Sequence, residues 1–525
     1  MDGDEMGKRG GSAPAEDEAG QAREARLRRR DFLVTTGVGA TALVLGCGDD
    51  DGGGGADGAV PADGGLPGDG GGLDGGLPGD GGGLDGGPGL DGGGGEDAGP
   101  EDAGTAPTGE LPEDTEESAA FPLGVAAGDA TESAVVLWTR YDGEAPLRLV
   151  VWRWDDGDYG PRIFEEAVTP AEGGFVHVAV PVSAGLRYRY AFFEMEGEAR
   201  IGRSLVGRVR AAIAADAMEP LVFGAVSCTR NGRDFETLAQ AGARDDLDAF
   251  LLLGDTTYND GAASRAEFRA KWAENFGAEG YRALRSATGL YATWDDHEID
   301  NNWNAEEIAP AVLEAATGAF FEHLPLGREA ADADRVWRRR RWGRTLELFV
   351  LDCRSERLPS TREGEDAQYV SPEQLAWLQE GLAGSTAVFK VVLNSVGITD
   401  FPGLIDFGSD DRWEGYAAQR EALLDHVDGL GISGVLWVAG DFHFASLGHV
   451  GSEEGERGWD QWEVLVGPGA QTANPLWRSC REPQFTFASG TNNYTELAFD
   501  PMTGAVTVRF IDGDGAVFEE QTITP

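Results

Sequence analysis

Side chains that can bind metal ions recur in this sequence directly after short apolar runs. In chain order they are Cys228 after Leu221–Ser227, Asp255 and Tyr258 after Ala249–Gly254, the run Asp295-Asp296-His297-Glu298 after Leu290–Trp294, and Asp441 and His443 after Val435–Ala439. Each motif alone is ordinary, since a Gly-Asp pair often marks only a turn. Because ligands of open α/β sheets gather beyond the carboxyl ends of the strands, the four motifs together predict one site.

The residue types at this predicted site favour bound metal ions. Carboxylates that cluster without cations repel each other and raise their own pKa values. Two divalent or trivalent ions, about 3.5–4 Å apart, would relieve this repulsion and hold a phosphate group. Thiolate from Cys228 and phenolate from Tyr258 suit a highly charged ion such as Fe³⁺, whereas carboxylate and amide oxygens suit Ca²⁺, Mg²⁺ or Mn²⁺.

The apolar runs alternate with helical patterns from residue 220 onward. Besides the runs above, we expect strands at Thr345–Leu351, Val388–Asn394, Trp462–Val466, Thr495–Phe499 and Val506–Phe510, and helices at Ser264–Phe276, Pro372–Leu382 and Tyr416–Val427. This alternation predicts an α/β domain of packed mixed β-sheets flanked by helices over residues 220–525.

A different pattern precedes this domain. Short β-rich segments separated by Gly, Asp and Pro predict strands at Ser133–Thr139, Leu147–Trp154, Gly174–Val180 and Leu186–Phe192. Such spacing is typical of a small antiparallel β-sandwich, which we expect over residues 119–215.

The motifs taken together resemble those of a known family. Gly-Asp-x-x-Tyr, Trp-Asp-Asp-His-Glu followed by Asn301-Asn302, Leu-Asp-x-Arg-x-x-Arg at 351–357, and Gly-Asp-x-His are similar to the motifs of the PhoD-like alkaline phosphatases/phosphodiesterases. That family belongs to the calcineurin-like metallophosphoesterases. Phe121–Asp129 and Val135–Arg140 also resemble its N-terminal domain, so the resemblance covers residues from about 121 to 525.

The resemblance implies a specific set of metal ligands. It implies Fe³⁺ held by Cys228, Asp255, Tyr258 and His443, and one or two Ca²⁺ ions near Asp255, Asn302 and Asp441. Asp296 is a further candidate ligand, and Asn301 is an alternative to Asn302. Zn²⁺, Mn²⁺ and Mg²⁺ are the alternative metals. The sequence departs from the family at Thr256, Thr257 and Phe444-Ala445, which leaves the ligands in place and the substrate preference open.

The implied activity is hydrolysis of phosphate esters by a metal-activated hydroxide. We expect His297 to protonate the leaving group, with Asp296 or Glu298 orienting its ring, and Arg357 to face the phosphate. The preferred bond, monoester or diester, stays open. A non-enzymatic alternative is a surface lipoprotein whose metal domain is degenerate and serves as a binding module.

The first 47 residues are typical of an export signal. Arg29-Arg30-x-Phe32-Leu33 resembles the twin-arginine motif, and the uncharged stretch 34–46 ends in Val44-Leu45-Gly46-Cys47, which resembles a lipobox. We therefore expect twin-arginine export and a lipid on Cys47 that holds the protein to a membrane, in the periplasm or at the cell surface.

Residues 48–118 have the composition of a disordered linker. They contain 19 acidic residues and no Lys or Arg, and Leu66-Pro67-Gly68-Asp69 recurs as Leu77-Pro78-Gly79-Asp80. The whole chain of 525 residues has a formal net charge of -50, which excludes nonspecific nucleic-acid binding as its main role. The basic run Arg338–Arg341 is interpreted as the solvated face of a hairpin. A disulfide between Cys353 and Cys480 stays open.

Overall fold

A computed structural model of the protein describes residues 111–328, 334–401 and 411–525. The signal segment, the lipid-anchor site at Cys47 and linker residues 48–110 lie outside the described residues, so these assignments stay predictions. For residues 111–118 the prediction of a disordered linker is wrong, because they contain a 3-10 helix at Pro112–Asp114 and Glu117 forms a β-bridge with Arg203. Within the described ranges, no helix is both long enough and apolar enough to cross a membrane.

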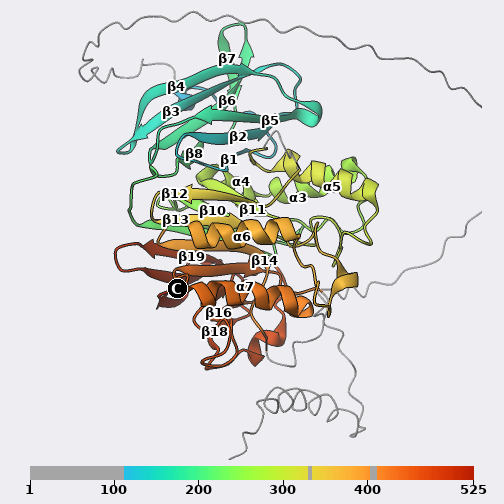
Figure 1. The fold of residues 1–525 in the computed structure, drawn as a ribbon. Coiled ribbons are helices and arrows are strands. Elements are labelled where there is room, and N and C mark those ends of the chain that lie inside the picture. Colours follow the sequence, from blue (N-terminus) through green and yellow to red (C-terminus); the bar gives the residue numbers. More distant parts are fainter. Residues whose placement is uncertain (1–110, 329–333, 402–410) are drawn as a thin grey trace, which may run out of the picture. The chain divides into compact units, whose positions relative to one another are not determined.

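The largest sheet has nine strands and runs through the middle of the fold (Figure 1). Its order is β21-β20-β19-β9-β10-β11-β1-β2-β5, and β9, β10, β11 and β1 are parallel to one another. The strand bounds are β1 Val125–Gly128, β2 Ala134–Arg140, β5 Phe175–Pro181, β9 Leu221–Val226, β10 Ala249–Leu253, β11 Gly289–Thr293, β19 Asn493–Asp500, β20 Ala505–Asp512 and β21 Val517–Ile523.

A seven-stranded sheet packs against this one. Its order is β12-β13-β14-β15-β17-β16-β18, with β13, β14, β15 and β17 parallel. The bounds are β12 Arg338–Trp342, β13 Leu346–Val350, β14 Phe389–Val396, β15 Val435–Gly440, β16 Ala445–His449, β17 Trp462–Leu465 and β18 Phe485–Ser489. Apolar side chains of both sheets form one buried cluster that includes Leu251, Leu348 and Val438.

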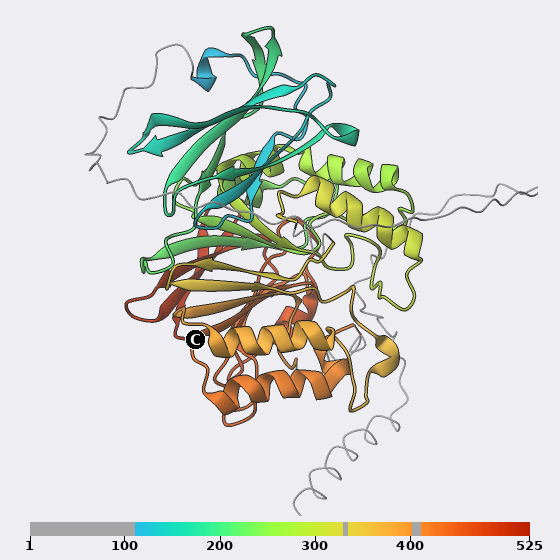
Figure 2. The same ribbon diagram turned by 45° about the horizontal axis from the view of Figure 1, so that its top comes forward.

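Helices cover the outer face of each sheet, which gives four layers. Figure 2 shows α6 and α7 side by side against the seven-stranded sheet, where they share a buried cluster with it. Helices α2, α3, α4 and α5 cover the nine-stranded sheet through a separate cluster. The bounds are α2 Glu236–Gly242, α3 Arg265–Phe276, α4 Glu279–Ala287, α5 Pro310–His323, α6 Pro372–Gly384 and α7 Ala417–Leu430.

Local sequence explains where several of these helices begin and end. Ser264 and Glu267 form a reciprocal capping box at the start of α3, and the Ser371 side chain caps α6, which begins at Pro372. Helix α7 ends at Gly431, whose φ of 61° lies in the left-handed region that glycine adopts readily. Short 3-10 helices occur at η2 Pro112–Asp114, η3 Glu172–Gly174, η4 Pro359–Thr361, η5 Trp413–Tyr416 and η6 Pro475–Ser479.

The strands of the N-terminal region divide between two sheets. Strands β3 Leu147–Asp155, β4 Asp158–Val168, β6 Arg187–Glu196, β7 Ala199–Arg203 and β8 Gly207–Arg210 form a five-stranded antiparallel sheet. It packs against β1, β2 and β5 through a buried cluster that includes Val125, Leu149 and Tyr190. Because β1 pairs in parallel with β11, one wall of this sandwich is a continuation of the nine-stranded sheet.

The predicted α/β architecture of packed mixed sheets flanked by helices is confirmed. The region predicted as a small antiparallel sandwich does contain two facing layers, but β1, β2 and β5 belong to the same hydrogen-bonded sheet as β9–β11. Pairing of this kind was not visible in the sequence, where Thr131–Arg210 and Leu221–Thr293 have different patterns. The domain boundaries themselves stay a prediction.

A buried ion pair connects the two large sheets near the start of the fold. Asp129 follows β1 and accepts hydrogen bonds from Arg338 of β12 at 2.9–3.0 Å and from Arg340 at 3.0 Å. Arg338 also donates to the carbonyl oxygen of Ala292 in β11. Since Arg338 is only 9% exposed, the interpretation of Arg338–Arg341 as a solvated face is wrong for this residue.

We expect Asp129→Asn to lower the free energy of unfolding by about 3–5 kcal/mol, because it leaves the buried Arg338 charge without its partner. Burial raises the pKa of Asp129, but Arg338 and Arg340 outweigh it, and the folded-state pKa lies below the usual 3.8. The ion pair therefore stabilises the protein above about pH 3.8, and this contribution is lost as the pH falls through the folded-state pKa. Urea unfolding at several pH values measures both effects.

Asp142→Asn is the control, since its exposed pair with Arg140 contributes at most about 1 kcal/mol. Equal losses in the two variants would contradict the assignment.

Candidate metal centre

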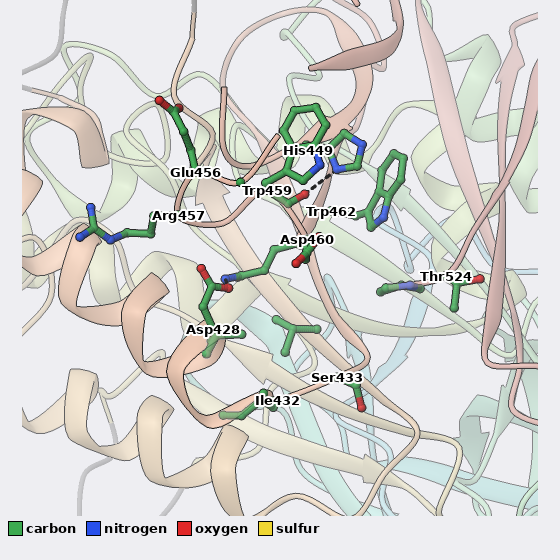
Figure 3. A pocket seen from close by; sticks show the side chains of 16 residues that line it. Asp428, Ile432, Ser433, His449, Glu456, Arg457, Trp459, Asp460, Trp462 and Thr524 are labelled. Carbon is green, nitrogen blue, oxygen red and sulfur yellow. Dashed lines mark hydrogen bonds between the residues drawn. The ribbon is translucent and has the colours of Figure 1, made fainter. Parts of the chain in front are cut away.

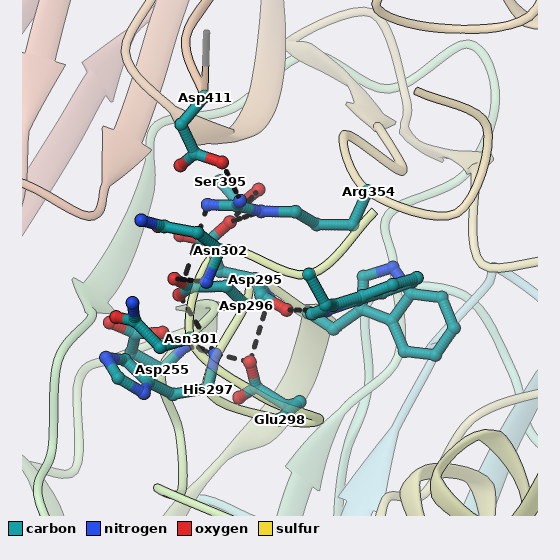
Figure 4. Close-up of polar contacts among 12 residues, drawn as sticks. Asp255, Asp295, Asp296, His297, Glu298, Asn301, Asn302, Arg354, Ser395 and Asp411 are labelled. Atoms are coloured by element: carbon teal, nitrogen blue, oxygen red, sulfur yellow. Dashed lines mark hydrogen bonds and ion pairs between the residues drawn. The ribbon is translucent and has the colours of Figure 1, made fainter. Parts of the chain in front are cut away.

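The predicted site residues follow the carboxyl ends of strands from both large sheets. Cys228 follows β9, Asp255 follows β10, Asp295 and Asp296 follow β11, and Asp441 follows β15. Figure 4 shows several of these side chains converging at this edge. Because the parallel strands of the two sheets end at the same edge, residues more than 200 positions apart in the sequence become neighbours.

Two glycines allow the strands to approach closely enough at this edge. A Cβ added to Gly254 would lie 2.4 Å from the Cβ of Asp295, and its φ of 90° also disfavours other residues. A Cβ added to Gly440 would lie 2.5 Å from the Cβ of Ser227. The Gly-Asp pairs in both motifs therefore have a packing reason as well as a chemical one.

One group of ligand-type side chains consists of Cys228, Asp255 and His443. Their donor atoms all lie within 4.8 Å of one another. The Tyr258 hydroxyl lies 3.3 Å from Asp255 Oδ2 and 3.2 Å from His443 Nε2, so it borders the same space. The structure thus brings together the four residues expected to hold Fe³⁺.

Two further groups overlap with the first. Asp255, Asp296 and His297 form one, and Asp295, Asp296 and Asp441 form the other, each with donor atoms within 4.8 Å of one another. Asp255 and Asp296 each belong to two groups, as expected of carboxylates that can bridge two ions. The groups therefore form one continuous cluster.

The Asn302 amide borders this cluster beside Asp296 and Asp411. With its nitrogen facing them, it donates to Asp296 Oδ2 at 3.1 Å and to Asp411 Oδ2 at 3.3 Å. With its oxygen facing them, three oxygen atoms would meet, an arrangement that a cation would stabilise. Asn302, rather than the exposed Asn301, is the amide in contact with Asp296.

The backbone is left-handed at most of these positions. The φ angles of Cys228, Asp255, Asn302, Asp441 and His443 lie between 51° and 69°. Residues other than glycine adopt this conformation at a cost of about 1–3 kcal/mol each. Its concentration at predicted ligands shows that the surrounding fold holds the side chains in place against local preference.

The electrostatics of the cluster favour added positive charge. Burial, followed by the carboxylates of Asp295 and Asp296, raises the pKa of Asp441 well above its usual value, and burial with the same neighbours does so for Asp255 against the opposing effect of His297. Burial and then Asp255 raise the pKa of the Cys228 thiol. These groups are poorly stabilised as anions by the protein alone, so the donor set and its charge fit bound metal ions.

Two arginines approach the cluster in different ways. Arg354 Nε donates to Asp295 Oδ1 at 2.5 Å, and its Nη2 lies 3.9 Å from Asp296 Oδ1 (Figure 4). The predicted phosphate-facing residue, Arg357, instead binds Asp411 at 2.7 Å and the carbonyl oxygen of Trp303 at 3.0 Å. Asp411 contacts both guanidinium groups, since Arg354 Nη1 donates to it at 2.6 Å.

His297 is oriented by Asp260 rather than by its sequence neighbours. His297 Nδ1 lies 2.8 and 2.9 Å from the two oxygens of Asp260, while its Nε2 is buried and has no partner among the described residues. The expectation that Asp296 or Glu298 orients the ring is therefore wrong. Although burial lowers it, the carboxylates of Asp296, Asp255 and Asp260 raise the pKa of His297 well above its usual value.

Glu298 has a structural role in the loops. Its carboxylate accepts hydrogen bonds from the backbone N–H groups of Asp255, Thr256 and Asp295 at 2.6–3.0 Å. Burial raises its pKa to about 7 against these hydrogen bonds. This side chain fixes the loop after β10 to the loop after β11, and therefore the spacing of Asp255 and Asp295.

Some residues that the structure adds to the predicted site lie within the sequence motifs, and others do not. Asp295 and Arg354 lie within motifs but had been given no role. Asp260 lies two positions after Tyr258, and it has a role only because the fold brings His297 next to it. Nothing in the sequence around Asp411 marked it, since its arginine partners are more than 50 positions away.

Another cavity of the described chain has no similar cluster of ligand-type side chains. A cavity of about 640 Å³ lies at the opposite end of β15, where His449 stacks between Trp459 and Trp462 with ring centroids 4.1 Å apart (Figure 3). Within the described ranges, the candidate metal groups all lie at the Asp255 edge. Cys353 and Cys480 are free thiols.

Comparisons with known proteins point to one family. The family model for PhoD-like phosphatases matches residues 223–477. Alkaline phosphatase D of Bacillus subtilis (strain 168) is 26% identical over 398 residues, which cover 64% of this chain and 66%, just under two thirds, of that protein.

Solved structures agree at the level of the fold. A structure of PhoD superposes with a TM-score of 0.66 at 22% identity, covering 78% of this chain and 89% of that one. Purple acid phosphatase PPD1 from seeds of yellow lupin (Lupinus luteus) gives 0.57 at 13% identity, covering 76% and 73%. The family-model match covers the strands and loops that carry the metal-ligand cluster, and the three comparisons agree on PhoD-like phosphatases as the proteins that this chain resembles.

Proposed function

We propose that the protein is a metal-dependent phosphoric ester hydrolase of the alkaline phosphatase/phosphodiesterase type, acting after export. The observation that carries this proposal is the continuous cluster in which Asp255 and Asp296 are shared between overlapping metal-ligand groups, beside His297. The similarity to alkaline phosphatase D supports the reaction class.

The donor atoms support two kinds of metal position. Cys228, Tyr258, His443 and Asp255 provide sulfur, phenol, imidazole and carboxylate donors, which suit Fe³⁺. Asp255, Asp296, Asn302 and Asp441 provide oxygen donors, which suit Ca²⁺, with Mg²⁺, Mn²⁺ or Zn²⁺ as alternatives. When bound, such ions supply a water molecule activated at neutral pH and neutralise the oxygens of the phosphate.

The side chains beside the cluster have separate roles in this proposal. His297, protonated and held through Nδ1 by Asp260, has an unpartnered Nε2 and gives a proton to the leaving alkoxide. Arg354 holds Asp295 and offers charge near Asp296, while Arg357 fixes Asp411. In this arrangement Arg354, rather than Arg357, is the better placed to face a phosphate oxygen.

The reaction class is tested by phosphate release from para-nitrophenyl phosphate and from its bis-ester, at alkaline pH and with or without added Ca²⁺. We expect metal-dependent turnover that Asp255→Ala abolishes, because this residue belongs to two ligand groups. The ratio of the two rates decides between monoesterase and diesterase. Asp425→Ala, a surface change, is the control. No turnover by the folded, metal-loaded protein would contradict the proposal and favour the binding-lipoprotein alternative.

We expect Cys228→Ser to lose the iron measured by inductively coupled plasma mass spectrometry, because a hydroxyl cannot replace the thiolate donor. Calcium content should change less. Cys480→Ser is the matched control, since its thiol is also buried but belongs to none of the candidate groups. Unchanged iron in Cys228→Ser would remove Cys228 from the ligand set.

We expect His297→Ala to lower kcat by about 10²–10⁴-fold with much smaller loss of metal, as is typical for removal of a general acid. Asp260→Asn should lower kcat less, and should shift the pH at which activity falls, because it removes a carboxylate that raises the pKa of His297. An ester whose leaving group is already acidic should reduce both effects. Loss of metal in parallel with kcat would instead assign His297 to the metal ligands.

A further inference from the structure

A small basic cavity lies at the opposite ends of β10 and β11 from the metal cluster. We call it the arginine pocket and define it by Arg187, Arg189, Arg208 and Arg210, which line a volume of about 200 Å³. Leu247, just before β10, and Thr288, just before β11, also line it, as does one acidic residue, Asp245. At about 3.3 Å per residue, the five-residue strands place it on the order of 16 Å from the residues that follow them.

The pairing of β6 with β8 gathers these four charges on one face. Arg187 is directly opposite Arg210, and Arg189 is directly opposite Arg208. Between them along the strands, Tyr188, Tyr190 and Val209 point into the sandwich core. Because alternate residues share a face, four guanidinium groups lie together on the other side, where opposed like charges destabilise the sheet.

Carboxylates of the protein neutralise only part of this charge. Asp248 accepts from Arg187 at 2.9 Å and from Arg210 at 2.7 Å, and Glu219 accepts from Arg210 at 2.9 Å. Among the described residues, by contrast, no carboxylate forms an ion pair with Arg189 or Arg208. Arg208 donates to the carbonyl oxygens of Gly242 and Arg244, and Arg189 lies 4.1 Å from the ring centroid of Trp154.

Burial and neighbouring arginines disfavour the charge on these two side chains. Burial, followed by the charge of Arg208, lowers the pKa of Arg189. Burial also lowers the pKa of Arg208, with Asp245 opposing and Arg187 adding to the effect. In a chain of formal net charge -50, a pocket with uncompensated positive charge is an exception that calls for a ligand.

The size and donor geometry of the pocket fit one chemical group. Planar guanidinium groups bind the oxygens of phosphate with paired hydrogen bonds, and several arginines together are a common basis of phosphate recognition. A volume of about 200 Å³ is below the usual range for drug-sized ligands. We propose that the arginine pocket binds a phosphoryl dianion, either as free inorganic phosphate or as the terminal phosphoryl group of a polyphosphate chain.

Calorimetric titration of the full chain with inorganic phosphate tests this proposal. The measurement uses both the natural protein and Asp255→Ala, in which binding at the metal cluster is impaired. We expect one saturable site to remain in Asp255→Ala. Adding Arg189→Gln or Arg208→Gln should weaken it by about tenfold or more, the value expected for a lost charge-assisted hydrogen bond. Higher chloride concentration should also weaken it.

Arg148→Gln is the matched control. It removes the same charge from the same sheet, but Arg148 is already paired with Glu165 at 3.1 Å. Phosphate affinity should therefore be unchanged. Arg189→Lys keeps the charge without the planar fork and should give an intermediate affinity, which separates loss of binding from loss of folding.

A second titration with polyphosphate distinguishes the two sources of the phosphoryl group. Similar affinities per phosphoryl group for both probes assign the pocket to the free ion, and binding of polyphosphate alone assigns it to the polymer. The proposal is overturned if neither probe binds to Asp255→Ala, or if Arg189→Gln and Arg208→Gln proteins with the natural melting temperature bind both probes unchanged. These results are independent of catalysis, since they are read as binding.

Discussion

Mutual repulsion among buried carboxylates is the constraint on which the metal-ligand cluster depends. Asp255, Asp295, Asp296 and Asp441 lie within one cluster, and their charges oppose one another in surroundings that exclude water. The protein holds them there by other means: strand ends that converge, backbone that is left-handed at the ligand positions, and the Glu298 carboxylate that joins two loops. The unfavourable arrangement is what makes the edge attractive to cations.

Two arginines of the protein compensate part of the negative charge of this cluster. Arg354 is fully buried and compensates Asp295, while Arg357 and Arg354 together hold Asp411 in place. Arg354 therefore compensates the cluster only in part, because Asp295 Oδ2 has no hydrogen-bond partner among the described residues. A fully compensated cluster would have less affinity for metal ions, so the incomplete pairing is consistent with a metal centre.

Sequence reasoning succeeded where chemistry and local pattern coincide. The motifs identified Cys228, Asp255, Tyr258 and His443 because each follows an apolar strand, and parallel strands bring such positions together. It failed for Asp260 and Asp411, because their partners are distant in the sequence and no local pattern predicts these contacts. It also failed at Arg338–Arg341, where a run of four arginines suggested solvent but two of them, Arg338 and Arg340, bind Asp129, more than 200 residues away in the sequence.

The continuity of the nine-stranded sheet limits how this protein can be divided. Cutting the chain between β8 and β9 would remove β1 from its place beside β11 and leave β11 as an edge. That strand is Gly-Leu-Tyr-Ala-Thr, buried along its whole length and without charge. An apolar edge of this kind is a template for pairing with other chains. The N-terminal strands therefore protect the nine-stranded sheet from aggregation, and the two regions are expected to unfold as one cooperative unit rather than as separable modules.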